Sequence, residues 1–261
     1  MSEKLLITQF SNKDLCVFCE GMEVKEIRCA GESSEAVLGD VYIGRVEKIR
    51  EDIHAAFVEI GPGKSCFFHL EEAKNSIFTA RYGNKPLNYG DELIVQVSRE
   101  GFGEKLPSVT GNISLTGEYS VLTSGKKTFG VSHRIPQAKR DSLYQLLSDR
   151  CTDDFGFVIR TNAVSASDSQ IISEMEELTQ EFEALKAKAV TRKCFSLLKK
   201  AVPDYEKAVI DLNKEGETEI ITDIPEIYDK LQVLLQKKYP EFTVKLRFYD
   251  DKMLSLAVLY D

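Results

Sequence analysis

The sequence predicts an α+β protein that combines a small β-barrel with helical segments. Five short apolar stretches, separated by turn residues, follow one another between Gly39 and Asn112. Strands of this number and length are typical of an OB-type barrel. After Tyr119 the pattern changes, because segments with apolar residues three and four positions apart alternate with short β-like runs. The chain is therefore expected to contain more than one domain.

Composition indicates an ordinary globular protein. Hydrophobic residues make up 43% and charged residues 29% of the 261 residues, and the net charge of −8 argues against coating nucleic acid through bulk positive charge. Local basic sites remain compatible with this charge. No apolar run is long enough to span a membrane and the N-terminus lacks a signal-peptide pattern, so we expect a cytoplasmic protein. The six cysteines are few and irregularly spaced, which favours reduced thiols.

The first part of the chain is predicted to be β-structure. Weak alternation over residues 4–29 indicates a three-stranded meander. A long loop is expected from Glu71 to Gly90, inside the barrel. The five barrel strands are predicted at residues 40–49, 54–60, 64–70, 91–98 and 106–115.

The second part is predicted to alternate between helices and strands. The longest helix, residues 167–201, is expected from the repeat Ile172, Met175, Leu178, Phe182, Leu185 and Ala189. Its acidic stretch, residues 173–184, is interpreted as a solvated face. The chain stops directly after an apolar run, which we interpret as a cut end. The other helices are predicted at residues 136–150 and 225–239, and the strands at 155–161, 207–213, 218–222 and 242–249.

Two phenylalanines are expected on the solvent side of the barrel. Successive side chains of a strand face opposite sides. In the stretch HAAFVEIGPGKSCFFHL, the alternate residues Ala56, Val58 and Ile60 form one apolar face, as do Cys66, Phe68 and Leu70. If these faces point into the core, Phe57 and Phe67 point outward. Two outward aromatic rings on adjacent strands can stack on nucleic-acid bases, but a neighbouring domain could equally cover them.

Other motifs favour structural interpretations. Cys16 and Cys19 form a CxxC pair on a predicted strand, where the two side chains face opposite sides and cannot share a metal ion. No nucleophilic triad is recognisable around the histidines, and the stretch GFGEK is interpreted as a hairpin turn. Four aspartates, Asp211, Asp223, Asp250 and Asp251, could suggest a two-metal carboxylate site. Because Asp223 and the pair at 250 and 251 flank predicted turns, solvated turn residues are favoured, and we predict no catalytic or metal-binding residue.

Several stretches in order along the chain resemble the RNase E/G family of bacterial endoribonucleases. They are GDVYIGRVEKIREDIHAAFVEIGPGKSCFFHL, GDELIVQVSRE, NISLTGEYSVL, GVSHRI, GFVIRTNA and VKLRFYDDKMLSL. The resemblance covers nearly the whole chain. It implies an S1-type OB-fold barrel inserted in a split RNase H-like domain, with a following domain that senses the RNA 5′ end. The implied boundaries are 1–38 with 205–261 for the RNase H-like domain, 39–112 for the barrel and 113–204 for the 5′ sensor.

The resemblance also implies site residues. Phe57 and Phe67 match an exposed aromatic pair that holds single-stranded RNA, and Lys105 matches a basic residue that contacts RNA. A further set would bind a 5′-monophosphate. Arg160 and Thr161 match the pair that binds the phosphate. Gly117 and Val121 match positions where backbone groups assist, and Arg134 matches a nearby arginine.

By the same resemblance, the chain is the RNA-binding and 5′-monophosphate-sensing portion of a single-strand-specific endoribonuclease that acts in RNA processing and decay. Family members continue into a DNase I-like domain with two aspartates that hold the catalytic Mg²⁺, and the full-length protein can form homo-oligomers. We therefore expect no cofactor in this chain and no cleavage by it alone. Two alternatives are a stand-alone, non-catalytic RNA-binding regulator and a nuclease that uses Asp211 or Asp223.

Overall fold

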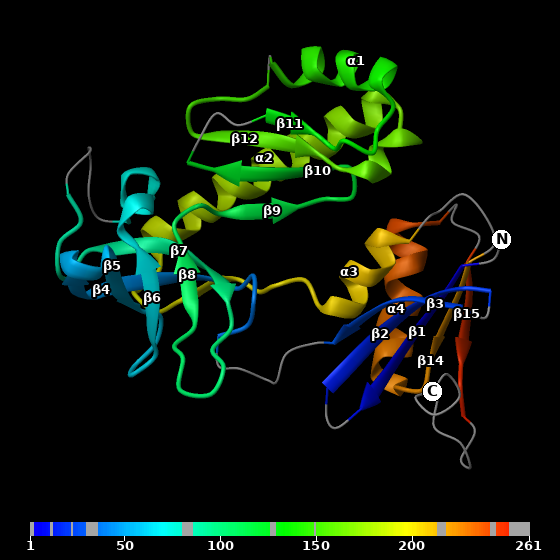
Figure 1. Cartoon of the computed structure of the whole chain (residues 1–261), viewed down its shortest axis with the longest axis horizontal. Coiled ribbons are helices and arrows are strands. Elements are labelled where there is room, and N and C mark those ends of the chain that lie inside the picture. Colours follow the sequence, from blue (N-terminus) through cyan, green and yellow to red (C-terminus); the bar gives the residue numbers. More distant parts are fainter. Residues whose placement is uncertain are drawn as a thin grey trace. The chain divides into compact units, whose positions relative to one another are not determined.

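The computed structural model divides the chain into two compact units (Figure 1). Unit 1 comprises Met1–Ser33 and Val202–Asp261, and unit 2 comprises Ser34–Ala201. No helix of the described part is long and apolar enough to cross a membrane. The structure describes residues 3–10, 13–21, 23–29, 36–79, 86–125, 129–148, 150–212, 218–240 and 244–250.

Unit 1 is built on a five-stranded sheet with the order β15-β14-β1-β2-β3. The antiparallel strands β1 (Glu3–Phe10), β2 (Lys13–Glu20) and β3 (Glu23–Cys29) form the predicted meander. The strands β14 (Thr218–Thr222) and β15 (Val244–Phe248) extend the sheet in parallel with β1. Two segments more than 170 residues apart in the sequence therefore complete one sheet.

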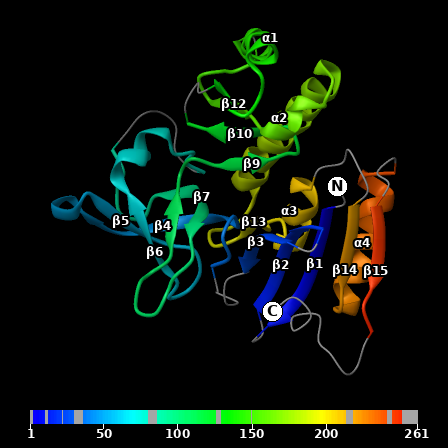
Figure 2. The same ribbon diagram turned by 45° about the vertical axis from the view of Figure 1, so that its right-hand side comes forward.

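Two helices cover one face of this sheet (Figure 2). Apolar side chains of α3 (Asp204–Asp211) and α4 (Pro225–Lys238) pack against Leu5, Ile7 and Cys16. The strand predicted at residues 207–213 is wrong, because the structure has α3 there up to Asp211. In a short apolar run, the periodicity of the sequence cannot distinguish a strand from a buried helix of one or two turns.

The CxxC pair behaves as its position on a strand predicts. Cys16 lies in the core beneath the helices, whereas Cys19 packs with Leu6 and Ile221 in a separate cluster. Burial raises the pKa of the Cys16 thiol to about 12 and also raises the pKa of Cys19. Both thiols are therefore protonated core residues at neutral pH.

Unit 2 contains a closed, OB-like five-stranded barrel, as predicted. Its sheet has the order β4-β5-β6-β8-β7, and an additional pairing of β4 with β7 closes it. Gly44 on β4 faces Val58 so closely that a Cβ atom would lie 2.5 Å from Val58 Cγ1. The strands are β4 (Val41–Arg50), β5 (Ala55–Glu59), β6 (Ser65–His69), β7 (Glu92–Arg99) and β8 (Ser108–Thr110).

The last predicted barrel strand is divided in the structure. Residues 106–115 were expected to form one strand, but β8 ends at Thr110 and β9 (Ser114–Thr116) belongs to the next sheet. The Gly111–Asn112 turn separates the two strands. In the loop predicted over residues 71–90, the 3₁₀-helix η2 (Leu70–Asn75) follows β6, and residues 80–85 lie outside the described part.

The remainder of unit 2 is a four-stranded sheet backed by a long helix (Figure 1). The sheet has the order β11-β12-β10-β9, and apolar side chains of α2 form a common core with the sheet and with the outer side of β4. The elements are β10 (Ser120–Ser124), β11 (Phe129–Val131), α1 (Gln137–Ser148), β12 (Phe155–Ile159) and α2 (Asp168–Thr191).

Helix α2 is shorter than predicted. It begins with a capping box between Ser167 and Gln170 and ends at Thr191 instead of continuing to residue 201. The chain then passes through Phe195, whose φ of 68° is incompatible with a right-handed helix, into β13 (Leu197–Lys199), which pairs with β4. The buried stripe of the helix also begins at Ile171, one position before the expected Ile172.

Candidate nucleic-acid interface

Phe57 and Phe67 form an aromatic pair on the outer side of the barrel. They are direct cross-strand partners on β5 and β6, and their ring centroids are 6.3 Å apart with the rings nearly perpendicular. Both side chains are partly exposed, whereas their neighbours Val58 and Cys66 are fully buried. The outward orientation predicted from strand alternation is confirmed. His69 extends the aromatic surface, with its ring 4.9 Å from that of Phe67.

Two cations lie in register with the aromatic pair. Lys48 on β4 is the cross-strand partner of Phe57, Phe67 is paired with Ser108 on β8, and Ser108 is paired with Arg99 on β7. Lys48 and Arg99 are exposed, and neither forms an ion pair with another described residue. We call this series, Lys48, Phe57, Phe67, Ser108 and Arg99, the barrel row.

Irregularities in two strands place both cations in the barrel row. The register of β4 against β5 shifts between Val46 and Lys48, so that Lys48 rather than Glu47 lies opposite Phe57. A second shift, between Val97 and Arg99, places Arg99 opposite Ser108. Bulges of this kind change the direction of side chains and are frequent near functional sites. Sequence analysis missed Lys48 and Arg99, because simple alternation turns them toward the interior.

Lys105 is not a member of the barrel row but lies in the connection that joins Arg99 on β7 to Ser108 on β8. Phe102 and Lys105 exchange backbone hydrogen bonds of 3.2 and 3.1 Å across a turn in which Gly103 has a φ of 59°. The predicted hairpin turn is therefore confirmed. Lys105 is exposed at this turn, beside the highly exposed ring of Phe102. The RNA contact implied for Lys105 stays a prediction.

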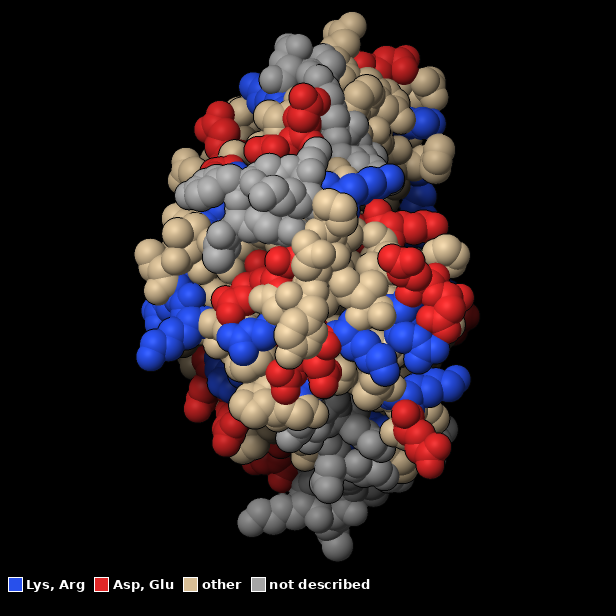
Figure 3. Space-filling view, turned by 90° about the vertical axis from the view of Figure 1, so that its left-hand side faces the viewer, with Lys and Arg blue, Asp and Glu red and all other residues tan. Residues whose placement is uncertain are grey.

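On the face that Figure 3 shows, the described Lys and Arg residues do not form a continuous basic surface. In Figure 3, Lys and Arg side chains lie in separate patches, between acidic side chains and uncharged surface. This distribution agrees with the net charge of −8. An anionic partner would therefore be held by particular cations rather than by a general positive field.

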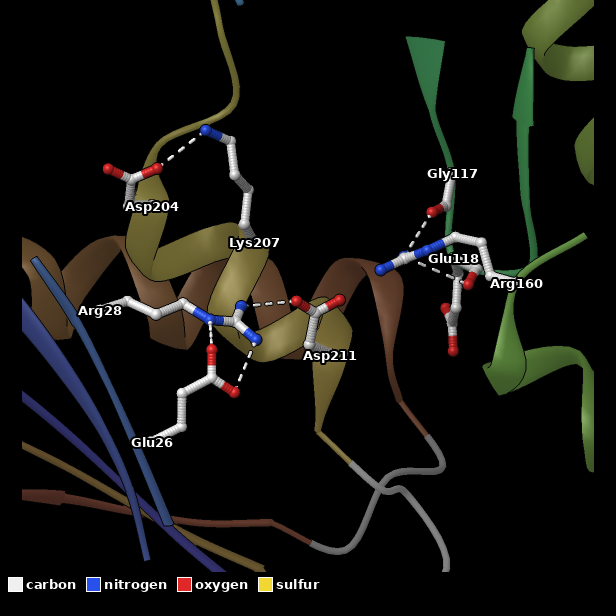
Figure 4. A network of polar contacts seen from close by, with 8 residues as sticks. All are labelled: Glu26, Arg28, Gly117, Glu118, Arg160, Asp204, Lys207 and Asp211. Atoms are coloured by element: carbon white, nitrogen blue, oxygen red, sulfur yellow. Dashed lines mark hydrogen bonds and ion pairs between the residues drawn. The ribbon is translucent and has the colours of Figure 1, made fainter. Parts of the chain in front are cut away.

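A second group of candidate residues lies where β12 ends beside the turn between β9 and β10. The Arg160 side chain donates from Nη1 to the carbonyl oxygens of Gly117, at 2.9 Å, and Glu118, at 3.4 Å (Figure 4). The backbone N–H of Arg160 donates to Tyr119 O at 2.7 Å. The structure thus brings together Arg160 and Gly117, which are 43 residues apart in the sequence.

Ser132 connects two further candidates. Its hydroxyl oxygen lies 2.9 Å from Thr161 Oγ1 and accepts a hydrogen bond of 3.4 Å from the backbone N–H of Arg134. Arg134 is exposed and Thr161 is partly exposed. Val121, on β10, is the cross-strand partner of Val158, two residues before Arg160. Thr161 and Arg134 are therefore held at the end of the same sheet that presents Arg160.

The N–H groups of the β9–β10 turn already have partners within the chain. The N–H of Gly117 donates to Ser120 O at 2.8 Å. The N–H groups of residues 118–120 all donate to the carboxylate of Glu174 on α2. Glu174 belongs to the acidic stretch that was expected to be solvated, and for this residue the expectation is wrong. The backbone assistance implied at Gly117 and Val121 is not tested by these contacts.

The aspartates considered for catalysis in unit 1 serve other contacts. Asp211 forms an ion pair of 2.6 Å with Arg28, which also pairs with Glu26 and lies over the Phe18 ring (Figure 4). The hydrogen bond from Arg28 lowers the pKa of Glu26. Asp223 is partly buried and accepts a hydrogen bond of 2.9 Å from Thr8. Asp223 lies in a bend between β14 and α4, as expected, but the expectation of a solvated side chain is wrong for Asp223 and for Asp211.

Of the remaining two aspartates, Asp250 is exposed, as expected, and Asp251 lies outside the described part. No group of three or more His, Cys, Asp or Glu residues that could hold a metal ion occurs among the described residues.

Comparison with known proteins identifies relatives along the whole chain. The sequence profile of the Ribonuclease E/G family matches residues 114–260. Ribonuclease G of Escherichia coli strain K12 is 27% identical over 95% of this chain and 53% of its own length. Ribonuclease G of Salmonella typhimurium is 26% identical over 100% of this chain and 55% of its own length. Ribonuclease E of Haemophilus influenzae is 26% identical over 96% of this chain and 28% of its own length.

These similarities extend over the barrel, the neighbouring sheet and unit 1. The chain spans about half the length of the ribonuclease G relatives that it matches. Because the family profile matches more than half of the chain, we conclude that this chain belongs to the ribonuclease E/G family.

Proposed function

We propose that this chain is an RNA-binding portion of an RNase E/G-type endoribonuclease, and that the barrel row holds single-stranded RNA. The observation that carries the proposal is the aromatic pair, because Phe57 and Phe67 lie in register on the outer side of the barrel. A base that stacks on an aromatic side chain contributes about 1 to 3 kcal/mol to binding. Two adjacent rings thus provide a surface for unpaired bases.

The chemistry of the barrel row favours a single strand over a duplex. In a duplex, the faces of the bases are covered by their neighbours, whereas the bases of a single strand can be turned out onto aromatic rings. Lys48 and Arg99, at the two ends of the row, are suited to neutralising phosphates beside the stacked bases. The row therefore offers the two kinds of contact that single-strand binding uses.

We also propose that the Arg160 region binds a 5′-monophosphate. A guanidinium presents a planar fork of donors that matches two phosphate oxygens, and Thr161 adds a hydroxyl. The bonds from Arg160 to Gly117 O and Glu118 O support the proposal, because they fix the orientation of the side chain. A terminal monophosphate has one more unesterified oxygen than an internal phosphodiester, so a pocket shaped for it can distinguish the two.

For the whole protein we propose ribonuclease activity in RNA processing and decay in the cytoplasm, with Mg²⁺ as cofactor. Support comes from the family assignment and from the relatives, which are named ribonuclease G and ribonuclease E. Self-association belongs to the same proposal about the whole protein. Within this proposal, the barrel row and the Arg160 region supply the binding step.

Binding of one RNA sequence with three different 5′ ends tests the 5′-end proposal. We expect an unstructured oligonucleotide with a 5′-monophosphate to bind more tightly than the same strand with a 5′-hydroxyl or a 5′-triphosphate, as measured by fluorescence anisotropy. Arg160→Gln should remove this preference, because a neutral amide loses the charge-assisted bonds, while binding of 5′-hydroxyl RNA stays unchanged. Equal affinities of the wild-type chain for all three ends would contradict the proposal.

A further inference from the structure

Glu174 on α2 binds three consecutive backbone N–H groups. Its Oε2 accepts from the N–H of Glu118 at 2.5 Å, and its Oε1 accepts from the N–H groups of Tyr119 and Ser120 at 2.9 and 2.8 Å. The hydroxyl of Ser120 adds a fourth bond to Oε1, at 2.9 Å. Consecutive N–H groups that converge in this way form an anion-binding concavity, called a nest. We call the N–H groups of residues 118–120 the 118–120 nest. The anion that it binds is the carboxylate of Glu174, which belongs to the same chain.

Helix α2 holds the carboxylate in place. Ile171 and Met175, on either side of Glu174 in the sequence, are fully or almost fully buried in the core of unit 2. The nest also affects the electrostatics nearby, since burial and then the charge of Glu174 raise the pKa of Tyr119. The anion in the nest is thus a fixed part of the fold.

The carboxylate of Glu174 occupies the space that a side chain at position 117 would need. A Cβ atom at position 117 would lie 2.5 Å from Glu174 Oε1 and 2.8 Å from Oε2, closer than real Cβ atoms approach other atoms. The φ of Gly117 is not in the left-handed region, so backbone conformation does not require glycine here. A larger residue at position 117 would therefore displace the carboxylate from its place in the nest.

Glu174 and Arg160 bind opposite ends of the same two peptide units. In the Gly117–Glu118 unit, the N–H donates to Glu174 and the C=O accepts from Arg160. In the Glu118–Tyr119 unit, the N–H and the C=O have the same two partners. Because a peptide unit is planar, a carboxylate that fixes the N–H also fixes the C=O. A charge at each end polarises both peptide units in the same direction.

We propose that Glu174 is a positioning residue for the 5′-phosphate site and sets its selectivity. Through the two shared peptide units it holds the carbonyl oxygens that orient Arg160. By filling the 118–120 nest it also excludes other anions from the N–H side of the turn, so that a phosphate approaches only from the side of Arg160. This inference depends on the proposed 5′-end function.

The first test compares variants of the full chain for 5′-end preference. Glu174→Ala should bring the ratio of affinities for 5′-monophosphate and 5′-hydroxyl RNA close to one. Glu174→Gln, which retains one oxygen acceptor, should keep an intermediate ratio. The control is Glu177→Ala, an exposed residue of the same helix and charge, and it should keep the wild-type ratio. A wild-type ratio in Glu174→Ala would overturn the inference.

The second test uses inorganic phosphate and does not depend on RNA. In ¹H–¹⁵N NMR spectra, the amide signals of residues 118–120 should respond more strongly to phosphate in Glu174→Ala, where the nest is open, than in the wild-type chain, where phosphate reaches these peptide units only from the side of Arg160. Equal responses in both would overturn the inference, even where Glu174→Ala has lost its 5′-end preference through a local loss of structure.

The two tests also separate this inference from the proposed function. A wild-type chain without 5′-end preference would refute the 5′-end proposal and, with it, the role of Glu174 in selectivity. A phosphate response at residues 118–120 that is larger in Glu174→Ala than in the wild-type chain would still support the occupation of the nest.

Discussion

The barrel row and the 118–120 nest present their polar groups in opposite ways. In the row, side chains point outward from the strands, and Lys48 and Arg99 have no ion-pair partner among the described residues. In the nest, N–H groups converge on a carboxylate that the chain itself supplies. The row is a surface available to a ligand, whereas the nest is a site already filled, whose effect on a ligand passes through Arg160.

This difference predicts different consequences of mutation. Residues of the row contribute to binding and little to folding, since their outer sides are exposed. Residues of the nest contribute to both, because removing Glu174 leaves three N–H groups without their partner. Experiments that separate affinity from stability therefore test the comparison directly.

The largest effect is expected for the aromatic pair. Phe57→Ala and Phe67→Ala should each weaken binding of unstructured RNA by about 1 to 3 kcal/mol, because each removes one stacking surface. Fluorescence anisotropy measures the affinity, and the melting temperature checks the fold. Tyr89→Ala, which alters an exposed aromatic residue of unit 2 outside the row, is the control and should bind like wild type. Unchanged RNA affinity in both phenylalanine variants would contradict the proposal that the barrel row binds RNA.

An effect of similar size, on stability instead of affinity, is expected for the nest. Gly117→Ala and Glu174→Ala should each lower the free energy of unfolding by about 1 to 3 kcal/mol, because each deprives the turn of its hydrogen bonds to the carboxylate. The double variant, Gly117→Ala with Glu174→Ala, should be at least as stable as the less stable of the two single variants. The reason is that an added Cβ atom at position 117 meets no carboxylate once Glu174 is gone. Urea denaturation measures this cycle, and additive losses would show that Gly117 and Glu174 act separately.

The smallest effect is expected for the two cations of the row. Lys48→Ala and Arg99→Ala should each reduce the slope of log affinity against log salt concentration by about 0.7, the value for one phosphate contact on a single strand. Lys74→Ala, which removes an exposed cation outside the row, serves as the control. An unchanged slope in both variants would indicate that the RNA does not follow the row beyond the two rings.

Sequence analysis predicted those features that depend on local pattern. Phe57 and Phe67 face outward because strand alternation is regular in β5 and β6, and a barrel follows from the number and length of the strands. Lys48 and Arg99 could not be predicted, because the register shifts in β4 and β7 interrupt the alternation. A bulge cannot be recognised in the sequence of one strand, because it is defined by how that strand pairs with its neighbour.

Features that depend on distant contacts were missed or misinterpreted. Glu174 lies in an acidic stretch and looks solvated, but its partners lie more than 50 residues earlier in the chain. The region 192–201 seemed to continue α2, yet β13 forms there through pairing with β4. Helix α3 was predicted as a strand, because only its packing against β1 and β2 identifies the buried face. Tertiary context decides each of these cases.

The position of RNA on the barrel is the most direct test of the proposed function. A single-stranded oligonucleotide that carries 5-iodouridine at successive positions can be crosslinked by light to aromatic residues that it stacks on, and the modified peptides identified by mass spectrometry. We expect the crosslinks at Phe57 and Phe67. Crosslinks confined to other residues, with both phenylalanines unmodified at saturating RNA, would contradict the proposal that the barrel row binds the strand.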